Sequence, residues 1–308
     1  MQSQEKFFLL TIFLAVLLIY NGLNKQFDID RNLAAINPFN SSEPKCPVIK
    51  DIEFTATNNK GQYDENLTSN HNYVIIFDPK SPNLDFKVSV GLSHKLYAQD
   101  SKGNFRQDYQ PKLFRELISD ENSTLDGRRP IAAINGDYID KGNKPEGFNV
   151  SRGVEYSGSS KGKRSSFSIS GGKPEKRKAI IQLGNRKDVL LNYNVVGGNG
   201  RFYKNGKFEN ICPALGDYIC GKETSRSLVA ITSKGYVILL VNDANLKYAL
   251  YPSMFDDVLE GIAANYCLGK IQEGMLFDNG YSTGLYFDNN VYVNPTHPVG
   301  SVFLIYKK

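Results

Sequence analysis

The 308-residue sequence predicts an α+β fold: a single domain with a mixed, largely antiparallel sheet and flanking helices, preceded by an N-terminal apolar export or anchor helix. Three observations support this prediction. Apolar and polar residues alternate over residues 84–91, as in a half-buried antiparallel strand. Residues 108–120 and 253–267 instead repeat apolar side chains at helical spacing. A hydrophobic content of 41% is ordinary for a globular core.

The N-terminal segment differs from the rest of the chain. Residues 7–20 are apolar on all sides and carry no charge, which is typical of a signal peptide and shorter than the roughly 18 residues of a spanning helix. No A-x-A cleavage site follows. We therefore expect residues 1–24 to be a signal peptide or membrane anchor that contacts the membrane through residues 7–20, and residues 25–45 to be a polar linker. The body would then be extracytoplasmic: periplasmic, at the cell surface or secreted, either released or membrane-anchored.

The folded domain is predicted to span residues 46–308, with residues 46–128 as a candidate N-terminal subdomain and 129–308 as the core. Apolar or alternating runs predict the strands, which are expected over residues 48–57, 73–78, 84–91, 130–134, 179–183, 189–196, 225–232, 236–242 and 274–278.

Two helices are predicted to pack on the sheet. The first, residues 108–120, has an apolar face that includes Leu113. In the second, residues 253–267, Ser253 is expected to cap the N-terminus, with Asp256 at the capping-box position.

The four cysteines allow three complete pairings and fit no zinc module. Export makes disulfides chemically reasonable. Cys212 and Cys220 bracket a short loop that one bridge could close, whereas Cys46 and Cys267 would have to meet through the fold. Free buried thiols are the alternative.

Charge and motifs exclude several functional classes. A formal net charge of +5 is too weak to indicate nucleic acid, and no zinc finger, RNA-recognition signature or phosphate loop is present. His71, His94 and His297 are isolated, so neither a histidine metal centre nor a serine triad is supported. We expect no cofactor and no nucleic-acid partner. A calcium ion bound by carboxylates and carbonyls is an alternative to this expectation, although no D-x-D-x-D-G run supports one.

Polar residues follow several predicted strands at the point where each strand ends. Asn135 and Asp137 follow residues 130–134, and Asp278 ends residues 274–278. Loops at strand ends commonly carry chemistry on a rigid scaffold, so these groups are candidate site residues. The alternative is an ordinary turn whose Asn and Asp bond their own backbone.

Further candidates lie in the loops beside these strand ends. The turn GNKPEG carries Glu146 toward a short segment that ends at Arg152, and Arg226 lies at the mouth of residues 225–232. Gly197 and Gly198 allow a close backbone approach to a ligand, or simply a tight turn. Residues 161–178 hold seven Lys or Arg and predict a basic hairpin tip, which is either a solvated loop or a landing surface for an anionic glycan.

The order of several short motifs resembles the phosphodiester glycosidase domain family, over roughly residues 131–305. Residues 134–139 are similar to the family's I-N-G-G-[FY]-F strand end, and residues 145–147 to its P-x-G segment. Residues 197–198 are similar to its GG pair, and residues 205–207 to the N-G-K that follows. Residues 226–227 are similar to its R-[ST] pair, and residues 277–283 to its L-D-G-G-x-S-[TS] signature. Asp137 and Asn279 stand where the family has glycine, and Tyr281 where it has a small residue.

The resemblance implies an exported glycosidase that hydrolyses the sugar-phosphate bond of a sugar-1-phosphodiester on a glycan or envelope polymer. A phosphomonoester is a good leaving group, so its departure needs charge neutralisation more than a strong acid, and Arg226 could supply this through paired donors. Attack by water needs one carboxylate base, for which Asp278, Asp137 and Glu146 are candidates.

Within this scheme we assign Asp278 to activating water or stabilising the sugar cation. Glu146 would be a second acid or a hydroxyl contact, and Asn135, Ser282 and Thr283 would orient groups by hydrogen bonds. A third carboxylate at Asp137 should repel an anionic product unless its pKa is raised or a cation is bound. The alternative function is a non-catalytic envelope protein that binds a glycan phosphate through the same cleft and residues 161–178.

Overall fold

The computed structural model describes residues 46–65, 69–92, 98–99, 105–106, 109–157, 164–183, 193–216, 220–244 and 248–308. The predicted apolar segment and linker lie outside these residues. Pro47–Lys308 forms one compact unit. Among the residues that the structure describes, no helix is both long and apolar enough to cross a membrane.

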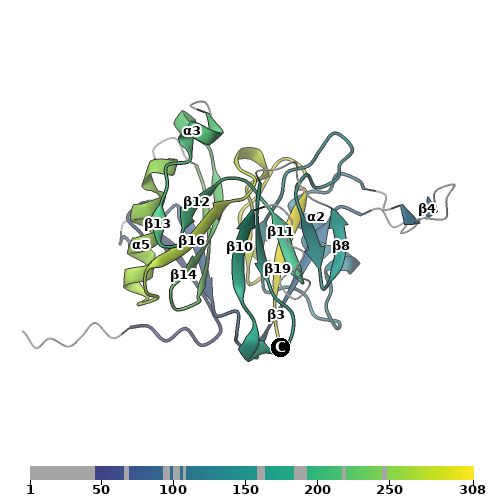
Figure 1. Ribbon diagram of the computed structural model, residues 1–308, viewed down its shortest axis with the longest axis horizontal. Coiled ribbons are helices and arrows are strands. Elements are labelled where there is room, and N and C mark those ends of the chain that lie inside the picture. The colour runs from purple at the N-terminus through teal and green to yellow at the C-terminus, as the bar shows by residue number, and fades with distance from the viewer. Residues whose placement is uncertain are drawn as a thin grey trace, which may run out of the picture. The chain divides into compact units, whose positions relative to one another are not determined.

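Three larger sheets and a two-stranded ribbon make up the unit (Figure 1). Every strand pair described by the structure is antiparallel. The predicted antiparallel character is therefore confirmed. The strands are divided among several sheets, however, and do not form the one mixed sheet that was expected.

The seven-stranded sheet has apolar residues on both faces. Leu228 and Ala230 belong to the apolar cluster that includes the helix α5 (Phe255–Asn265), whereas Val229 and Ile231 belong to the cluster shared with the other sheets. Its strands, in sheet order, are β1 (Ile52–Thr57), β2 (Asn72–Phe77), β15 (Val237–Asn242), β14 (Arg226–Thr232), β16 (Ile271–Leu276), β12 (Arg201–Lys204) and β13 (Lys207–Phe208). The strands predicted over residues 225–232 and 236–242 are present as β14 and β15, which pair with each other as a hairpin.

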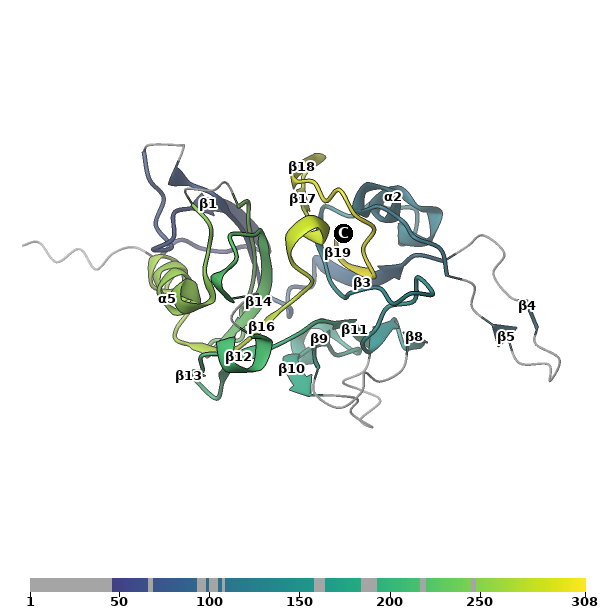
Figure 2. The ribbon, with the colours of Figure 1, turned by 90° about the horizontal axis from the view of Figure 1, so that it is seen from above.

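The two five-stranded sheets lie on the side of the large sheet away from α5 (Figure 2). One has the order β18 (Asn290–Val293), β17 (Leu285–Phe287), β6 (Ala132–Asn135), β19 (Ser301–Lys307) and β3 (Leu84–Val90). The other has the order β10 (Ala179–Leu183), β9 (Ser165–Ile169), β11 (Asn194–Gly197), β7 (Asn149–Ser151) and β8 (Val154–Ser157). The ribbon pairs β4 (Ala98–Gln99) with β5 (Phe105–Arg106).

The helix predicted over residues 108–120 is shorter, and forms only α2 (Phe114–Ser119). Gln110 donates its backbone N–H to Gly91 at 3.0 Å, so the chain before the helix is held as an extended segment. Leu113 is also extended, and its side chain is 40% exposed. Long-range pairing therefore prevails over the local helical pattern.

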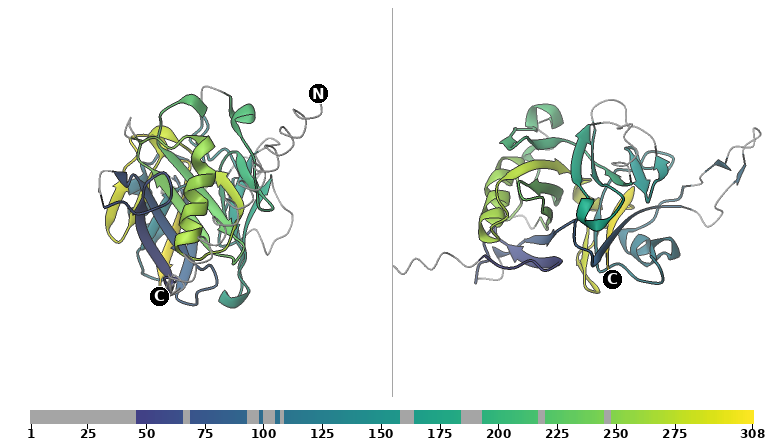
Figure 3. Two further views of the ribbon diagram at one scale, coloured as in Figure 1. Left: turned by 90° about the vertical axis from the view of Figure 1, so that its left-hand side faces the viewer. Right: turned by 60° about the horizontal axis from the view of Figure 1, so that its bottom comes forward.

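The second predicted helix is present as α5 (Phe255–Asn265), which covers the outer face of the large sheet (Figure 3). Its predicted cap is wrong. Ser253 lies in the short helix η4 (Pro252–Met254), and Met254 precedes α5 without a side-chain cap. Asp256 instead accepts a hydrogen bond from the buried Tyr203 hydroxyl, a partner that local spacing does not reveal.

Short elements complete the unit: η2 (Glu121–Ser123), η3 (Pro174–Lys176), α3 (Cys212–Leu215) and η5 (Gly280–Ser282). Cys212 and Cys220 form the predicted loop-closing disulfide, with 5.5 Å between their Cα atoms. Cys46 and Cys267 are also disulfide-bonded, so none of the four cysteines is a free thiol.

Candidate functional site

The C-terminal ends of β6 and β16 meet, although the two strands belong to different sheets. Asp278 donates its backbone N–H to the Gly136 carbonyl at 2.8 Å, and the Asn135 side-chain amide donates to the Asp278 carbonyl at 2.8 Å. The two strand ends that the sequence singles out are therefore joined directly.

Asn135 holds this junction together and is fully buried. Its side-chain oxygen accepts hydrogen bonds from the Ser227 hydroxyl at 2.5 Å and from the Gly284 N–H at 3.0 Å. With these partners its amide contacts strand β14 and the segments at Asp278 and Gly284, and it presents no surface to a ligand. Asn135 is thus placed to orient the Asp278 segment through hydrogen bonds.

The Asp278 carboxyl is 8% exposed and opens onto a cavity of roughly 400 Å³. It accepts a hydrogen bond from the Asn279 N–H at 2.8 Å and one from the Ser282 hydroxyl. Burial raises the pKa of Asp278 to about 7, and the nearby charge of Asp137 acts in the same direction. Such a carboxyl can both accept and release a proton near neutral pH.

The same cavity is lined by Arg226, Tyr138, Asn279 and Tyr281. Arg226 is the first residue of β14, and its guanidinium donates to the Lys222 carbonyl at 3.1 Å. Its side chain is fully buried, which lowers its pKa by desolvation. Arg226 therefore forms a buried wall of the cavity, while Tyr281, 69% exposed, forms part of the rim.

Asp137 is fully buried beside this cavity and is surrounded by donors. Its carboxylate accepts from the N–H of Gly147 at 2.5 Å, the N–H of Tyr138 at 2.9 Å and the Asn149 amide at 2.7 Å. Burial is the largest influence on the pKa of Asp137 and raises it to about 6, despite these bonds.

Arg164 places a positive charge next to Asp137, one of the two conditions under which Asp137 was expected not to repel an anionic product. Its guanidinium donates to the Asp137 carboxylate at 2.9 Å and to the Gly198 carbonyl at 2.9 Å. It also pairs with Glu146 and lies over the Tyr138 ring, with 4.6 Å between its central carbon and the ring centroid. The buried carboxylate is thereby neutralised, which removes the expected repulsion of an anionic product.

Glu146 and Arg152 are placed differently from the expectation. Glu146 is 44% exposed at its side chain and is bound by Arg164, and it does not line the Asp278 cavity. Arg152 lies in the exposed turn after β7, at the other end of that strand from Asn149. There its charge acts on Lys87, so Arg152 does not join the site.

Gly197 and Gly198 were expected to allow a close backbone approach to a ligand or a tight turn, and the backbone N–H groups of both are used within the protein. Gly197 donates to the Asn149 side chain at 3.2 Å, and Gly198 donates to the Ser165 carbonyl at 3.0 Å. A Cβ atom at Gly197 would lie 2.4 Å from the Asp137 carboxylate. The glycine is needed there because the buried carboxylate packs against its backbone.

Ser282 and Thr283 also differ from each other. The Ser282 hydroxyl donates to the Asp278 carboxyl and lies 3.5 Å from the Pro298 carbonyl oxygen. Thr283 is 1% exposed and does not line the cavity, so its hydroxyl is not available to a ligand there.

Sequence reasoning missed Arg164, Tyr138, Asn149 and Asn279 as site residues. Arg164 was counted among the cations of the basic hairpin tip, and only the fold shows that it turns inward to Asp137. Asn279 could have been found from its position, because it directly follows Asp278 and replaces a family glycine. Its side chain accepts the Ser227 N–H at 3.1 Å.

Among the residues that the structure describes, no three His, Cys, Asp or Glu side chains are grouped as a metal site would require.

A family model described as phosphodiester glycosidase matches residues 128–306, more than half of the chain. No curated protein matches the sequence. The chain is similar in fold to a hypothetical protein from Synechocystis, at a TM-score of 0.53 and 13% identity. That match covers 84% of this chain and 62% of the Synechocystis protein, so the chain spans less than two thirds of its relative.

Two further solved structures are similar at lower scores. One is the zebrafish N-acetylglucosamine-1-phosphodiester alpha-N-acetylglucosaminidase catalytic domain, auto-inhibited by its pro-peptide, at a TM-score of 0.48, 13% identity and coverage of 86% of this chain and 92% of that one. The other is a protein named as exported from Burkholderia pseudomallei K96243, at a TM-score of 0.44, 8% identity and coverage of 76% and 73%.

Proposed function

Because the chain belongs to the phosphodiester glycosidase family, we propose that it hydrolyses the bond between the anomeric carbon of a sugar and a phosphodiester on a glycan or envelope polymer. The observation that carries the proposal is Asp278. This residue closely follows strand β16 and lines the cavity, and its carboxyl has a pKa of about 7. A carboxylate with these properties suits a general base at neutral pH.

The proposed reaction has one bond-breaking step. Water attacks the anomeric carbon as the bond from that carbon to the phosphate oxygen breaks, and the Asp278 carboxylate takes the proton from the water. The bonding electrons leave with the phosphate oxygen, giving a phosphomonoester. Asn279 and Ser282 hold the Asp278 carboxyl by hydrogen bonds during this step.

We assign Arg226 to the phosphate, since it lines the cavity next to Asp278 and its burial strengthens any interaction with an anion. Arg164 with Asp137 supports this site from behind, because the pair holds Tyr138 at the cavity wall.

A binding protein without turnover is the second candidate function. The observation that favours it is the departure from the family at Asp137 and Asn279, where side chains replace glycine in the two signature motifs. Both side chains are hydrogen-bonded within the protein, and Asn279 lines the cavity beside Asp278. Such a protein would bind a glycan phosphate in the same cavity.

Turnover separates the two functions. The full chain would be incubated with a panel of sugar-1-phosphodiesters that vary the sugar and the aglycone, and free reducing sugar would be measured. Release above that of an Asp278→Asn control supports the glycosidase. Saturable binding of the same compounds with no release supports the binding protein.

The rate should depend on pH through Asp278. Since burial raises the pKa of its carboxyl to about 7, it is protonated and inactive as a base at lower pH. We therefore expect kcat/KM to rise about 10-fold for each pH unit well below 7 and to level off above it. An initial-rate profile from pH 4.5 to 9 measures this. A rate that is constant from pH 5 to 8 would exclude Asp278 as the base.

We place the protein outside the cytoplasm, because its cysteines are disulfide-bonded and such bonds persist in oxidising compartments. We also propose that residues 7–20 contact the membrane, and that the protein binds no nucleic acid and needs no cofactor.

A further inference from the structure

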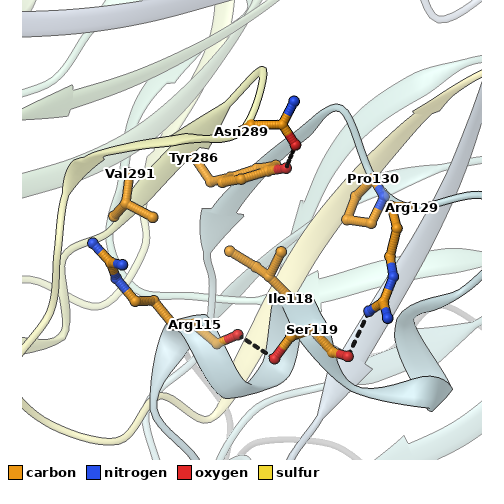
Figure 4. Close-up of a pocket in the computed structure, with 8 residues that line it drawn as sticks. All are labelled: Arg115, Ile118, Ser119, Arg129, Pro130, Tyr286, Asn289 and Val291. Carbon is orange, nitrogen blue, oxygen red and sulfur yellow. Dashed lines mark hydrogen bonds between the residues drawn. The ribbon is translucent and has the colours of Figure 1, made fainter.

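A second cavity lies at the opposite end of β6 from Asn135 and Asp278. It has a volume of roughly 430 Å³ and lies between α2, the chain entering β6 and the β17–β18 hairpin (Figure 4). We call it the arginine pocket, and its lining residues are Arg115, Ile118, Ser119, Arg129, Pro130, Tyr286, Asn289 and Val291. None of them lines the Asp278 cavity or belongs to a motif of the family resemblance.

Two guanidinium groups give the arginine pocket its charge. Figure 4 shows Arg115 and Arg129 on opposite sides of the pocket, with Ile118 between them. No described residue forms an ion pair with either arginine, whereas the adjacent Arg128 pairs with Asp85 and Asp126. No described carboxylate lines the pocket. Two uncompensated positive charges on facing walls favour an anion between them.

Each arginine is held in place by a neutral partner. The Arg115 Nε donates to the Asn294 side chain at 3.1 Å, and one terminal nitrogen of Arg129 donates to the Ser119 carbonyl at 2.5 Å. The bond from Arg129 to Ser119 stabilises the C-terminal end of α2, which gives Arg129 a structural role. The bond from Arg115 to Asn294 does not stabilise a helix end in this way. A guanidinium has five N–H donors, so each arginine keeps donors for a ligand.

The remaining lining is apolar or aromatic. Ile118 and Pro130 are buried beneath the pocket, and Val291 lies on the side of Arg115. The Tyr286 ring forms the facing wall, where its hydroxyl bonds the Asn289 side chain at 3.3 Å. A ligand that fits this lining combines an anionic group with a ring that has both apolar and hydrogen-bonding surface.

We propose that the arginine pocket binds an anionic saccharide, a sugar ring that carries a phosphate or a carboxylate. Arg115 and Arg129 hold the anion by charge-assisted hydrogen bonds, which planar guanidinium groups form in pairs with either group. The sugar ring packs on Tyr286, and a ring hydroxyl reaches Asn289. The choice of a saccharide rests on the proposed function, under which this pocket holds a glycan polymer away from the bond being cleaved.

Binding to the full chain tests the proposal. Isothermal titration calorimetry would compare N-acetylglucosamine 1-phosphate, glucuronic acid, neutral N-acetylglucosamine and inorganic phosphate. Arg115→Ala with Arg129→Ala should weaken glucuronic acid binding about 10-fold or more, because two charge-assisted bonds are lost. Arg152→Ala removes one exposed arginine outside the pocket and should change nothing. Should the alanine pair fail to fold, Arg115→Gln with Arg129→Gln removes the charges and keeps donors.

Two outcomes would overturn the proposal: glucuronic acid binding that does not respond to loss of both arginines, or inorganic phosphate binding as tightly as the sugar phosphate. Comparing the phosphate and the uronic acid shows which anion the pocket prefers. The double variant should keep its turnover of a small soluble sugar-1-phosphodiester and show a higher KM for an anionic polymer. If the protein turned over none of the substrates, the proposed glycosidase activity would be refuted. The titrations would still show whether the arginine pocket binds an anionic saccharide.

Discussion

Asp278→Asn is expected to lower turnover of a sugar-1-phosphodiester by roughly 10²-fold or more while binding is largely kept. The substitution removes the group that takes the proton from water and preserves its shape. The amide oxygen can still accept the hydrogen bonds from Asn279 and Ser282, so the cavity should keep its geometry. Single-turnover kinetics together with a direct binding measurement separate the two effects.

The same variant should be more stable than the wild type at pH 8. The pKa of an unburied Asp is near 3.8, and burial raises that of Asp278 to about 7, so between these values the folded protein holds a proton that the unfolded chain has released. The stability contributed by this group is therefore lost as pH rises through that range. Asparagine avoids the loss, and we expect a gain of roughly 1 to 4 kcal/mol in the free energy of unfolding at pH 8.

Denaturant titration at pH 8 and pH 4 checks this, because the gain should disappear at the lower pH. Asp257→Asn is the matched control for turnover: it changes an exposed acid in the first turn of α5 that does not line the cavity, and should leave turnover unchanged. A fully active Asp278→Asn enzyme would reassign the base. If Asp278→Asn were less stable than the wild type at pH 8, the conclusion that burial of the charged Asp278 carboxylate costs stability would be wrong.

Arg164→Met is expected to lower stability and turnover together. Its loss leaves the buried Asp137 carboxylate without a cation, releases Glu146 and uncovers Tyr138. Breaking a buried pair from one side is costly, and we expect a loss of roughly 2 to 4 kcal/mol, with some relief because Arg164 is 19% exposed and three neutral donors remain on Asp137. Turnover should fall about 10²-fold because Tyr138 lines the cavity.

The pH dependence identifies the cause of this loss. Arg164 opposes the rise in the pKa of Asp137, so without it that pKa moves above about 6 and the charged carboxylate becomes more costly as pH rises. The destabilisation should therefore be larger at pH 8 than at pH 5, by denaturant titration. Adding Asp137→Asn should restore much of the stability, since the amide removes the buried charge.

Arg201→Met provides a matched comparison, because Arg201 is similarly half-buried and pairs with Glu273 in the large sheet, away from the cavity. It should cost less stability, since Glu273 is 19% exposed, and leave turnover intact. Equal losses of activity in the two variants would mean that Arg164 acts only through general stability.

Local patterns in the sequence were sufficient for elements that are stabilised by their own periodicity and by burial on both faces. The β14–β15 hairpin and α5 are examples, because continuous apolar runs and a helical stripe allow few other arrangements. The helix predicted over residues 108–120 was mostly wrong, since the backbone of Gln110 pairs with Gly91 and no local pattern encodes that partner.

For the site, local sequence patterns were enough to predict that Asp278, Asn135 and Asp137 stand near strand ends, because apolar runs stop there and polar residues follow. Short motifs in a fixed order also indicated the family. Which charged side chains meet depends on the folding of distant segments against one another. Arg164 reaches Asp137 across 27 residues, Glu146 turns outward, and Arg152 lies at the wrong end of β7. Interactions between charged side chains depend on distance and burial in three dimensions, and neither is a property of position along the chain.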